Sequence, residues 1–545
     1  MRTFLPAVFL FFTITVSAQL QLPLQANRVS ALFSANGFLF TDFSYMAQYT
    51  VPGYSAGQEN NATIFAGGFW MGGYDDADQL HLAASTYRQT GDDYWAGPIA
   101  TNYTNPDYID RYSKVWPVDR AEIENHIANW DVPGYLVPPS IAYWPGNGNV
   151  ANGEAAILAP FYDYNNNLIY DPENGDYPLV RGDKAIYMIF NDAAEEHGES
   201  GGEALGVELH VMAYGFDMPE DSALNQTVFV NVSVINRSVN NYNEFIFGNF
   251  ADFDLGAYDD DYVGCDSNLN VFFAYNGDPV DGPTFGNYGS NPPAQGVIFL
   301  NRPMHAFKYY NNDFSVTGNP TTGEDFYNYL NGKWIDGTNQ TEGGNGYGGA
   351  VPMNFMYPGH PMDPDAWTEM REENVPSDRR GIGSIRPVTL NAGDSMCIEM
   401  AYLSAFVFDT VNAEGTTTDV HALGATEILL RRTVDVIDYY NANYEACQIA
   451  YQSNPNYSSI VASDIANNIS ISPNPANDFI EVQLGGENVI GTIVLMDNQG
   501  RRIYESTLSG QPSISLEITE YPAGMYNLLI IPESGAILSA SFIKH

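Results

Sequence analysis

Four valines at alternate positions constrain the fold more than any other feature of this chain. Val228, Val230, Val232 and Val234 repeat with the two-residue period of a β-strand, and the run ends at polar residues 236–238. Similar candidate strands occupy residues 185–190, 207–216, 245–250, 269–275, 388–390 and 395–403. Because polar turns separate consecutive strands, we predict an all-β body built as an antiparallel sandwich or jelly roll with long loops.

Two segments of the body differ from this pattern. Residues 276–380 are rich in turn-forming residues, and we expect them to be mostly loop. Within 420–449, apolar residues recur roughly at helical spacing with few helix breakers. These apolar residues are Leu423, Ile428, Leu430, Val434, Ile437 and Tyr440. We therefore expect one helix near 420–449 that covers the body.

The charge balance limits the partners of this chain. The 545 residues include 66 acidic and 21 basic side chains, which gives a net charge of −45. Such a surface repels phosphate backbones and attracts divalent cations, so we expect no binding to nucleic acid. No segment after the N-terminal 18 residues is long and apolar enough to span a membrane.

Three cysteines, Cys265, Cys397 and Cys447, are too few for a disulfide framework. One bridge can form in an oxidising compartment, and Cys265–Cys397 is the pair we predict. Buried free thiols are the alternative that the sequence leaves open.

The N-terminus predicts export. A short basic start precedes the apolar residues 4–16, and small residues precede Ala18. This pattern is typical of a Sec signal peptide over residues 1–18, cleaved between Ala18 and Gln19. The acidic body then covers 19–451, with a division into two subdomains near 150–180 left open. A polar linker is expected over 452–468, followed by a separate domain over 469–545.

The C-terminal domain alternates apolar and polar residues in several short runs. Ile480, Val482 and Leu484 form one such run, and Tyr526, Leu528 and Ile530 form another. Turn-forming residues lie between the runs. We expect a small immunoglobulin-like β-sandwich.

Four short motifs follow one another in this domain. They are Ser-Pro-Asn-Pro, Asp-x-x-Gly-Arg, Gly-x-Tyr and a basic residue close to the end, carried by Pro473, Asn474, Pro475, Asp497, Gly500, Arg501, Gly524, Tyr526 and Lys544. In this order they resemble the type A C-terminal sorting domain of type IX secretion substrates. The resemblance implies recognition by an outer-membrane translocon and its sortase. It further implies removal of the domain, with the body anchored to surface lipopolysaccharide or released.

Oxygen-bearing residues recur in the segment 163–176 at the spacing of a calcium loop. Asp163, Asn165, Asn167 and Asp171 take positions 1, 3, 5 and 9, and Ile169 would offer its carbonyl at position 7. Leu168 replaces the glycine of an EF-hand and Asn174 replaces its glutamate, although Glu173 or Asp176 could supply the missing carboxylate. The segment resembles the calcium loops of dockerins and thrombospondin type 3 repeats. A turn capped by its own side chains is the alternative.

A second acidic cluster lies between two predicted strands. Its carboxylates are Asp252, Asp254, Asp259, Asp260, Asp261 and Asp266. Packing them together without a cation would cost repulsion, so we predict a second calcium site, with a solvated acidic loop as the alternative. A third group, which includes His197, Glu199, Glu208 and His210, lacks zinc-ligand spacing, and we interpret it as a solvated acidic loop.

Catalytic signatures are missing from the sequence. It contains no Gly-x-Ser-x-Gly, no Cys-x-x-Cys and no dinucleotide fingerprint. Aromatic residues beside Gly and Pro, among them Phe69, Trp70, Trp116 and Trp144, are expected to pack in the core rather than to stack on sugars. We therefore expect a secreted or cell-surface calcium-binding β protein with a role in adhesion, glycan binding or surface structure. The alternative is a secreted polysaccharide-degrading hydrolase that uses paired carboxylates.

Overall fold

The computed structural model describes three parts of the chain. They are residues 20–407 except 88, 166 and 284–285, residues 422–444, and residues 469–544 except 475, 485–489, 498–501, 511–512, 523 and 533–537. The predicted signal peptide, its cleavage site at Ala18 and Gln19, the linker 452–468 and Cys447 lie outside the described residues.

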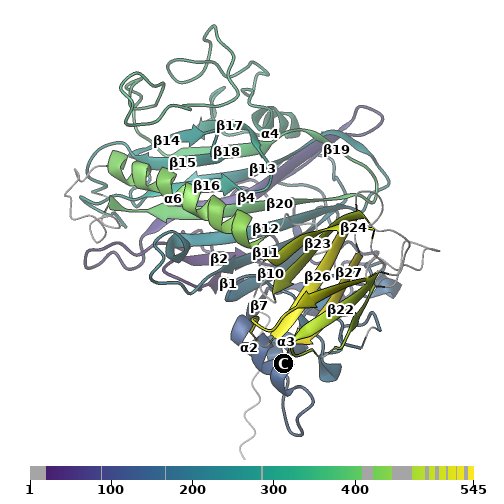
Figure 1. The fold of residues 1–545 in the computed structure, drawn as a ribbon. Helices are drawn as coiled ribbons and strands as arrows, with labels where there is room; N and C mark the ends of the chain where they lie inside the picture. Colours follow the sequence, from purple (N-terminus) through teal and green to yellow (C-terminus); the bar gives the residue numbers. More distant parts are fainter. Residues whose placement is uncertain are drawn as a thin grey trace, which may run out of the picture.

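The first large sheet of the body combines strands that are far apart in the sequence (Figure 1). In spatial order it contains β1 (Gln21–Leu24), β2 (Ser30–Ser34), β3 (Tyr49–Thr50), β4 (Ala62–Tyr74), β13 (Tyr242–Phe253), β18 (Arg379–Ile385) and β17 (Met304–Asn311), with β5 (Leu80–Ala84) beside β4 and β19 (Val388–Leu390) beside β13. Neighbouring strands are antiparallel, as in the pairs β4–β13 and β13–β18.

The second large sheet is also antiparallel. Its order is β14 (Asp261–Asp266), β15 (Val271–Asn276), β16 (Ala294–Phe299), β20 (Ser395–Ala405), β12 (Thr227–Asn236), β11 (Val207–Gly215), β10 (Lys184–Asn191) and β6 (Trp95–Ala96), with β7 (Trp116–Asp119) beside β10. Strands from either side of residues 150–180 pair in both sheets. A domain division at this point would therefore separate hydrogen-bonded neighbours.

Two apolar cores hold these layers together. The first lies between the sheets, where Phe69 and Phe247 of the first sheet share a cluster with Val230 and Ile398 of the second. The second core covers the opposite face of the second sheet, and its main cover is α6 (Ala422–Asn443), which contacts β15, β16 and β20 (Figure 1). The predicted antiparallel sandwich and the helix over residues 422–443 are confirmed.

Several short elements depart from the predictions. Helices α1 (Pro106–Tyr112), α2 (Arg120–Asn129), α3 (Pro139–Ala142) and α4 (Gly323–Leu330) add to the single helix that was expected. The prediction of a mostly irregular 276–380 misses β16, β17 and α4. These helices are too short for a clear apolar period, and capping side chains such as those of Asn105, Asp119 and Thr322 mark where they begin.

The glycine pairs on either side of Phe69 and Trp70 have a packing reason. A Cβ on Gly68 would lie 2.4 Å from the carbonyl oxygen of Ser85, and one on Gly72 would lie 2.8 Å from the Tyr327 ring. The indole of Trp70 is fully buried and donates to the same Ser85 oxygen at 3.0 Å. Core packing of these aromatic residues is therefore confirmed.

The predicted disulfide is wrong. Cys265 on β14 is buried and free, whereas Cys397 on β20 takes part in a disulfide bond. Strands β15 and β16 lie between β14 and β20, so three strand spacings of about 4.8 Å separate them. This distance of about 14 Å greatly exceeds the Cα separation of about 6 Å that a disulfide allows.

The C-terminal part of the chain forms a small sandwich with its own core. One sheet contains β21 (Ile469–Ser472), β22 (Phe479–Leu484) and β25 (Ser513–Glu517), and the other contains β24 (Arg502–Ser509), β23 (Ile490–Asp497), β26 (Gly524–Pro532) and β27 (Leu538–Lys544). Apolar residues such as Ile480, Leu495 and Leu528 fill the space between them. The predicted small β-sandwich is confirmed. Across the described residues, no helix is long and apolar enough to cross a membrane.

Candidate metal centre

The pairing of β13 with β18 creates the strongest candidate site. Because the strands are antiparallel, the end of β13 meets the start of β18, and Asp252 faces Arg380 in the register. Asp254 follows two residues after Asp252, a spacing that keeps both side chains on one side of the chain. A register shift between Asp252 and Phe253 in the pairing with β4 marks a bulge, a feature that re-aims side chains at strand ends. Asp378 comes immediately before β18.

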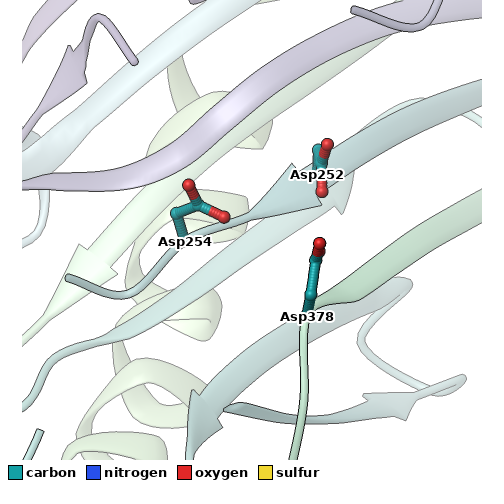
Figure 2. Close-up of side chains that lie close together, drawn as sticks. All are labelled: Asp252, Asp254 and Asp378. Atoms are coloured by element: carbon teal, nitrogen blue, oxygen red, sulfur yellow. The ribbon is translucent and has the colours of Figure 1, made fainter. Parts of the chain in front are cut away.

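Three carboxylates meet at this junction. One oxygen each of Asp252, Asp254 and Asp378 lies within 4.8 Å of the other two (Figure 2). The Asp252 side chain is buried, whereas Asp254 and Asp378 are partly exposed, so the group can be reached from solvent. Within the described part of the chain, the buried Oδ1 atoms of Asp252 and Asp378 have no hydrogen-bond partner.

One guanidinium faces these carboxylates. Nε of Arg380 lies 3.1 Å from Oδ2 of Asp252, and its Nη2 lies 3.5 Å from Oδ2 of Asp378. The amide of Asn312 also donates to Asp378 Oδ2, at 2.9 Å. Burial disfavours the charge of Arg380, but Asp252 and the neighbouring Tyr310 and Asp378 outweigh burial and raise its pKa. Arg380 therefore offsets only part of the negative charge of the three carboxylates.

The pKa values of Asp252 and Asp254 are raised, as expected for carboxylates that are buried close to other negative charges. Burial raises the pKa of Asp252 to about 7, with a further contribution from Asp378 and an opposing one from Arg380. Burial and repulsion by Asp252 and Asp378 raise the pKa of Asp254 well above its usual range. A hard divalent cation accepts carboxylate oxygens of this kind, and its charge would remove the repulsion. The chemistry of the group therefore fits calcium or magnesium.

The other members of the predicted second cluster lie elsewhere. Asp259 is exposed, and Asp260 and Asp261 lie near Asp281, where Asp261 accepts from the backbone N–H of Leu255 at 3.1 Å. Asp266 is at the opposite end of β14, where it accepts from the N–H groups of residues 268 and 269 in a turn. Only Asp252 and Asp254 of the predicted set are joined at the three-carboxylate centre, and Asp378 was missed.

The segment 163–176 is closed by hydrogen bonds within itself. The Asp163 carboxylate accepts from the N–H groups of Asn167 and Leu168 at 3.1 and 2.8 Å, and Ile169 N–H donates to the Asn167 side chain at 2.7 Å. The Asp176 carboxylate accepts hydrogen bonds from the backbone N–H groups of Tyr164 and Asp171 at 2.7 and 2.8 Å.

The amide groups of this segment gather at one carboxylate. Asn165, Asn167 and Asn174 donate to the oxygens of Asp171 at 2.9 to 3.3 Å. Burial raises the pKa of Asp176 to about 7, and Asp171 and Asp163 raise it further against the effect of its hydrogen bonds. The carboxylates of the predicted loop are thus close enough to repel one another.

The third acidic group is a solvated loop only in part: its members Glu195, Glu196 and Glu203 are exposed, but His197, Glu199, Glu208 and His210 are buried, contrary to the prediction. His197 is buried with its two ring nitrogens 2.7 Å from the carbonyl oxygens of Leu82 and Asp192. Glu208 is equally buried and binds His210 and Arg237, each at 2.8 Å. Leu82 and Trp95 contact His197, and Ile99 and Arg237 contact Glu208. These partners are distant in the sequence or outside the strand pattern, so local sequence does not indicate the burial.

Motif residues of the C-terminal domain converge on neighbouring strands. Asp497 pairs with Tyr526 between β23 and β26, and Gly524 pairs with Lys544 between β26 and β27. The Tyr526 hydroxyl donates to the carbonyl oxygen of Pro522 at 2.7 Å. Of the other predicted motif residues, Pro475, Gly500 and Arg501 lie outside the described residues.

Comparison with known families identifies this domain. Residues 470–544 match the family described as the secretion system C-terminal sorting domain (Por_Secre_tail). The prediction of a secretion sorting domain is confirmed for this part of the chain, and the protein is exported by type IX secretion to the cell surface or the extracellular space. No curated protein matches the chain.

Solved structures resemble the chain only distantly. A polysaccharide lyase gives a TM-score of 0.18 at 7% identity, over 62% of this chain and 34% of its own. The BSP domain of a biofilm-associated protein gives 0.14 at 8%, over 66% and 59%. The CBM51-2 and INT domains of Clostridium perfringens ZmpB give 0.11 at 10%, over 66% and 92%. The chain spans about a third of the lyase, and scores this low carry no functional argument.

Proposed function

We propose that this protein is an extracellular calcium-binding β protein whose bound ions stiffen its long loops, with a role in adhesion, glycan binding or surface structure. One observation carries the calcium part. Asp252, Asp254 and Asp378 bring three carboxylates within 4.8 Å of one another, and two of their buried oxygens have no partner among the described residues. A buried acceptor without a partner costs about 1–3 kcal/mol, a cost that a coordinated ion would remove.

The position of the three carboxylates suggests what an ion would do. The chain leaves the sheet at the end of β17, at Asn311, and returns at Arg379 after the long segment that includes α4. Asp378 lies at the point of return, and Asp252 and Asp254 belong to the adjacent strand end. An ion shared by these residues would fasten the base of the long segment to the sheet.

The segment 163–176 is the second proposed calcium site. Its support is the raised pKa of Asp176, which is caused mainly by burial, with repulsion by Asp171 and Asp163 adding to it. Calcium binding there would require the side-chain oxygens of Asn165 and Asn167 to replace their N–H₂ groups as the inward-facing atoms.

The export route that we propose begins at the Sec translocon, which precedes the type IX machinery. From the sorting domain we further propose that a sortase attaches the body to surface lipopolysaccharide.

Calcium binding is tested on the full mature chain by isothermal titration calorimetry after removal of metals with a chelator. We expect heat of binding and a rise in Tm on adding calcium. Asp378→Asn should remove the stronger site and most of the rise. Asp259→Asn is the matched control, because it removes the same charge from an exposed residue of the same region. Equal binding by both variants would exclude the three-carboxylate centre.

A polysaccharide hydrolase is the second candidate function. It is favoured by a cavity of about 500 Å³ that is lined by the carboxylates of Asp107, Asp110 and Glu154 beside the exposed ring of Tyr143. Hydrolases of this kind need two carboxyl groups near the bond that they cleave. Release of reducing ends from a panel of polysaccharides would establish this activity, and its loss in Asp110→Asn would assign it to the cavity.

A further inference from the structure

The same cavity lies far from the three carboxylates in the sequence and has a different composition. It is formed by α1, the start of β7, the end of α3 and the segments that follow α3 and contain Asn147 and Tyr170. Its volume of about 500 Å³ is within the range of roughly 300–1,000 Å³ that is typical of small-molecule sites.

One aromatic ring in the cavity wall is available to a ligand. Trp116 and Trp144 also line the cavity, but each is only 4% exposed, and Trp144 donates its indole N–H to the carbonyl oxygen of Pro160 at 3.0 Å. Tyr143 is 66% exposed, a high value for a large aromatic residue. Its ring offers a flat apolar surface at the edge of a polar cavity.

Two basic side chains in the wall lack acidic partners. Arg111 and Lys114 form no ion pair within 4.0 Å in the described residues, although the chain has 66 acidic and 21 basic residues. Arg111 donates a long hydrogen bond of 3.4 Å to the carbonyl oxygen of Asn147, and its guanidinium carbon lies 5.9 Å from the centre of the Tyr112 ring. The guanidinium and ammonium groups therefore retain donors for a ligand.

The acceptors of the cavity are of two kinds. Glu154 is buried and fully used, since it accepts from Tyr112 at 2.6 Å, from Asn149 N–H at 2.6 Å and from Asn152 at 3.0 Å. It therefore shapes the cavity. Asp107 and Asp110 are exposed carboxylates on α1, each four residues before one of the two basic side chains. Negatively charged acceptors and positively charged donors thus line the same wall of the cavity.

We infer that this cavity binds an uncharged saccharide. A sugar ring has an apolar C–H face that fits the Tyr143 ring, and its adjacent hydroxyl groups both donate and accept, as Asp107, Asp110, Arg111 and Lys114 require. Anionic glycans are disfavoured, because three carboxylates line the cavity against two basic groups. This inference rests on the glycan-binding part of the proposed function and supplies its site and ligand class, and it does not require calcium.

The experiment is a screen of the full mature chain on an array of neutral and acidic oligosaccharides, with and without calcium, followed by calorimetry of the strongest neutral binder. Tyr143→Ala and Arg111→Gln should each weaken binding at least tenfold. Tyr258→Ala is the matched control, because Tyr258 is 51% exposed and lies outside the cavity. Circular dichroism and Tm confirm that each variant is folded, and Lys114→Gln provides an independent substitution in the same wall.

Each result decides for or against the inference. Binding of a neutral glycan that is lost in the cavity variants and kept in Tyr258→Ala supports it. Preferential binding of an acidic glycan, undiminished binding by the cavity variants, or no binding by the folded chain would overturn it. If Asp378→Asn loses calcium binding while glycan binding persists, both proposals stand separately. If calcium binds and no neutral glycan does, only the saccharide site is rejected.

Discussion

Asp252 of β13 and Asp378, the residue before β18, each bring a carboxylate oxygen to the same point of the body, within 4.8 Å of the other. Arg380 lies beside both and cannot neutralise them together with Asp254. The antiparallel register fixes this meeting, because the pairing of Asp252 with Arg380 places the residue before Arg379 next to the end of β13.

The first prediction is that removing one carboxylate from this centre changes stability in opposite directions without and with calcium. In the metal-free protein, Asp254→Asn should raise the free energy of unfolding by about 1 kcal/mol, since it removes a carboxylate that is disfavoured by burial and by repulsion from Asp252 and Asp378. In the presence of calcium the same variant should be less stable than the wild type, because calcium binding stabilises the wild type by about 2.7 kcal/mol at a calcium concentration of about 100 times Kd. Urea denaturation with and without calcium measures both values. Equal effects in the two conditions would contradict a metal at this centre.

The second prediction concerns pH. Burial raises the pKa values of Asp252 and Asp281 to about 7 and that of Asp260 to about 6, all above the value of 3.8 expected for the unfolded chain. The folded state then binds these protons more tightly. The stability that these three groups contribute is therefore fully present below about pH 4 and is lost as the pH rises towards 7.

Denaturation of the metal-free protein between pH 4.5 and 8 measures this loss. Calcium should reduce it, because the ion stabilises the ionised carboxylates. The pKa of Glu208 is about 2 in the folded protein, where His210 and Arg237 outweigh the effect of burial, so its opposite contribution falls below this range. Stability that rises from pH 4.5 to 7 without calcium would show that these carboxylates do not dominate.

Local patterns in the sequence predicted most of the large strands but not their neighbours. The alternation at Val207, Leu209 and Val211 predicts the strand that is observed as β11. It also suggests that Glu208 and His210 face water, whereas every residue of β11 is buried. The cover over this second face comes from distant segments, and a two-residue period carries no information about them.

The candidate metal centre was predicted in part for the same reason. Asp252 and Asp254 stand out because acidic residues are dense around them in the sequence. Asp378 follows a second acidic stretch, residues 363–373, but Asp254 and Asp378 are more than 100 residues apart in the sequence, and only the pairing of β13 with β18 brings Asp378 and Arg380 to the site. The sorting domain was easier to predict, because its motifs are local and fall on adjacent strands.

The third prediction concerns a buried amine in the first core. Nζ of Lys308 is buried without a hydrogen-bond partner in the described residues and lies 3.0 Å from the centre of the Trp334 ring. Burial lowers the pKa of Lys308 well below its usual value and outweighs the opposing effect of Asp336. Lys308→Met keeps the volume and removes the amine, so it should raise the free energy of unfolding at pH 7 by about 1–3 kcal/mol.

Lys308→Ala is the control for this substitution, because it removes the same amine and leaves a cavity that costs about 2–5 kcal/mol. Urea denaturation at pH 7 separates the two effects. If Lys308→Met is clearly less stable than the wild type, the contact between the amine and the Trp334 ring contributes more than its burial costs.

The fourth prediction concerns Cys265. Its thiol is 1% exposed within the first core and donates to the carbonyl oxygen of Met356 at 3.3 Å. Burial raises the pKa of this thiol well above its usual range, so the reactive thiolate is scarce. A chromogenic disulfide reagent should therefore detect no thiol in the folded protein. It should detect one thiol per chain after denaturation without reductant, since Cys397 is held in a disulfide. Rapid labelling of the folded protein would show that the edge of the sheet at β14 opens, and three thiols after denaturation would show that the disulfide is absent.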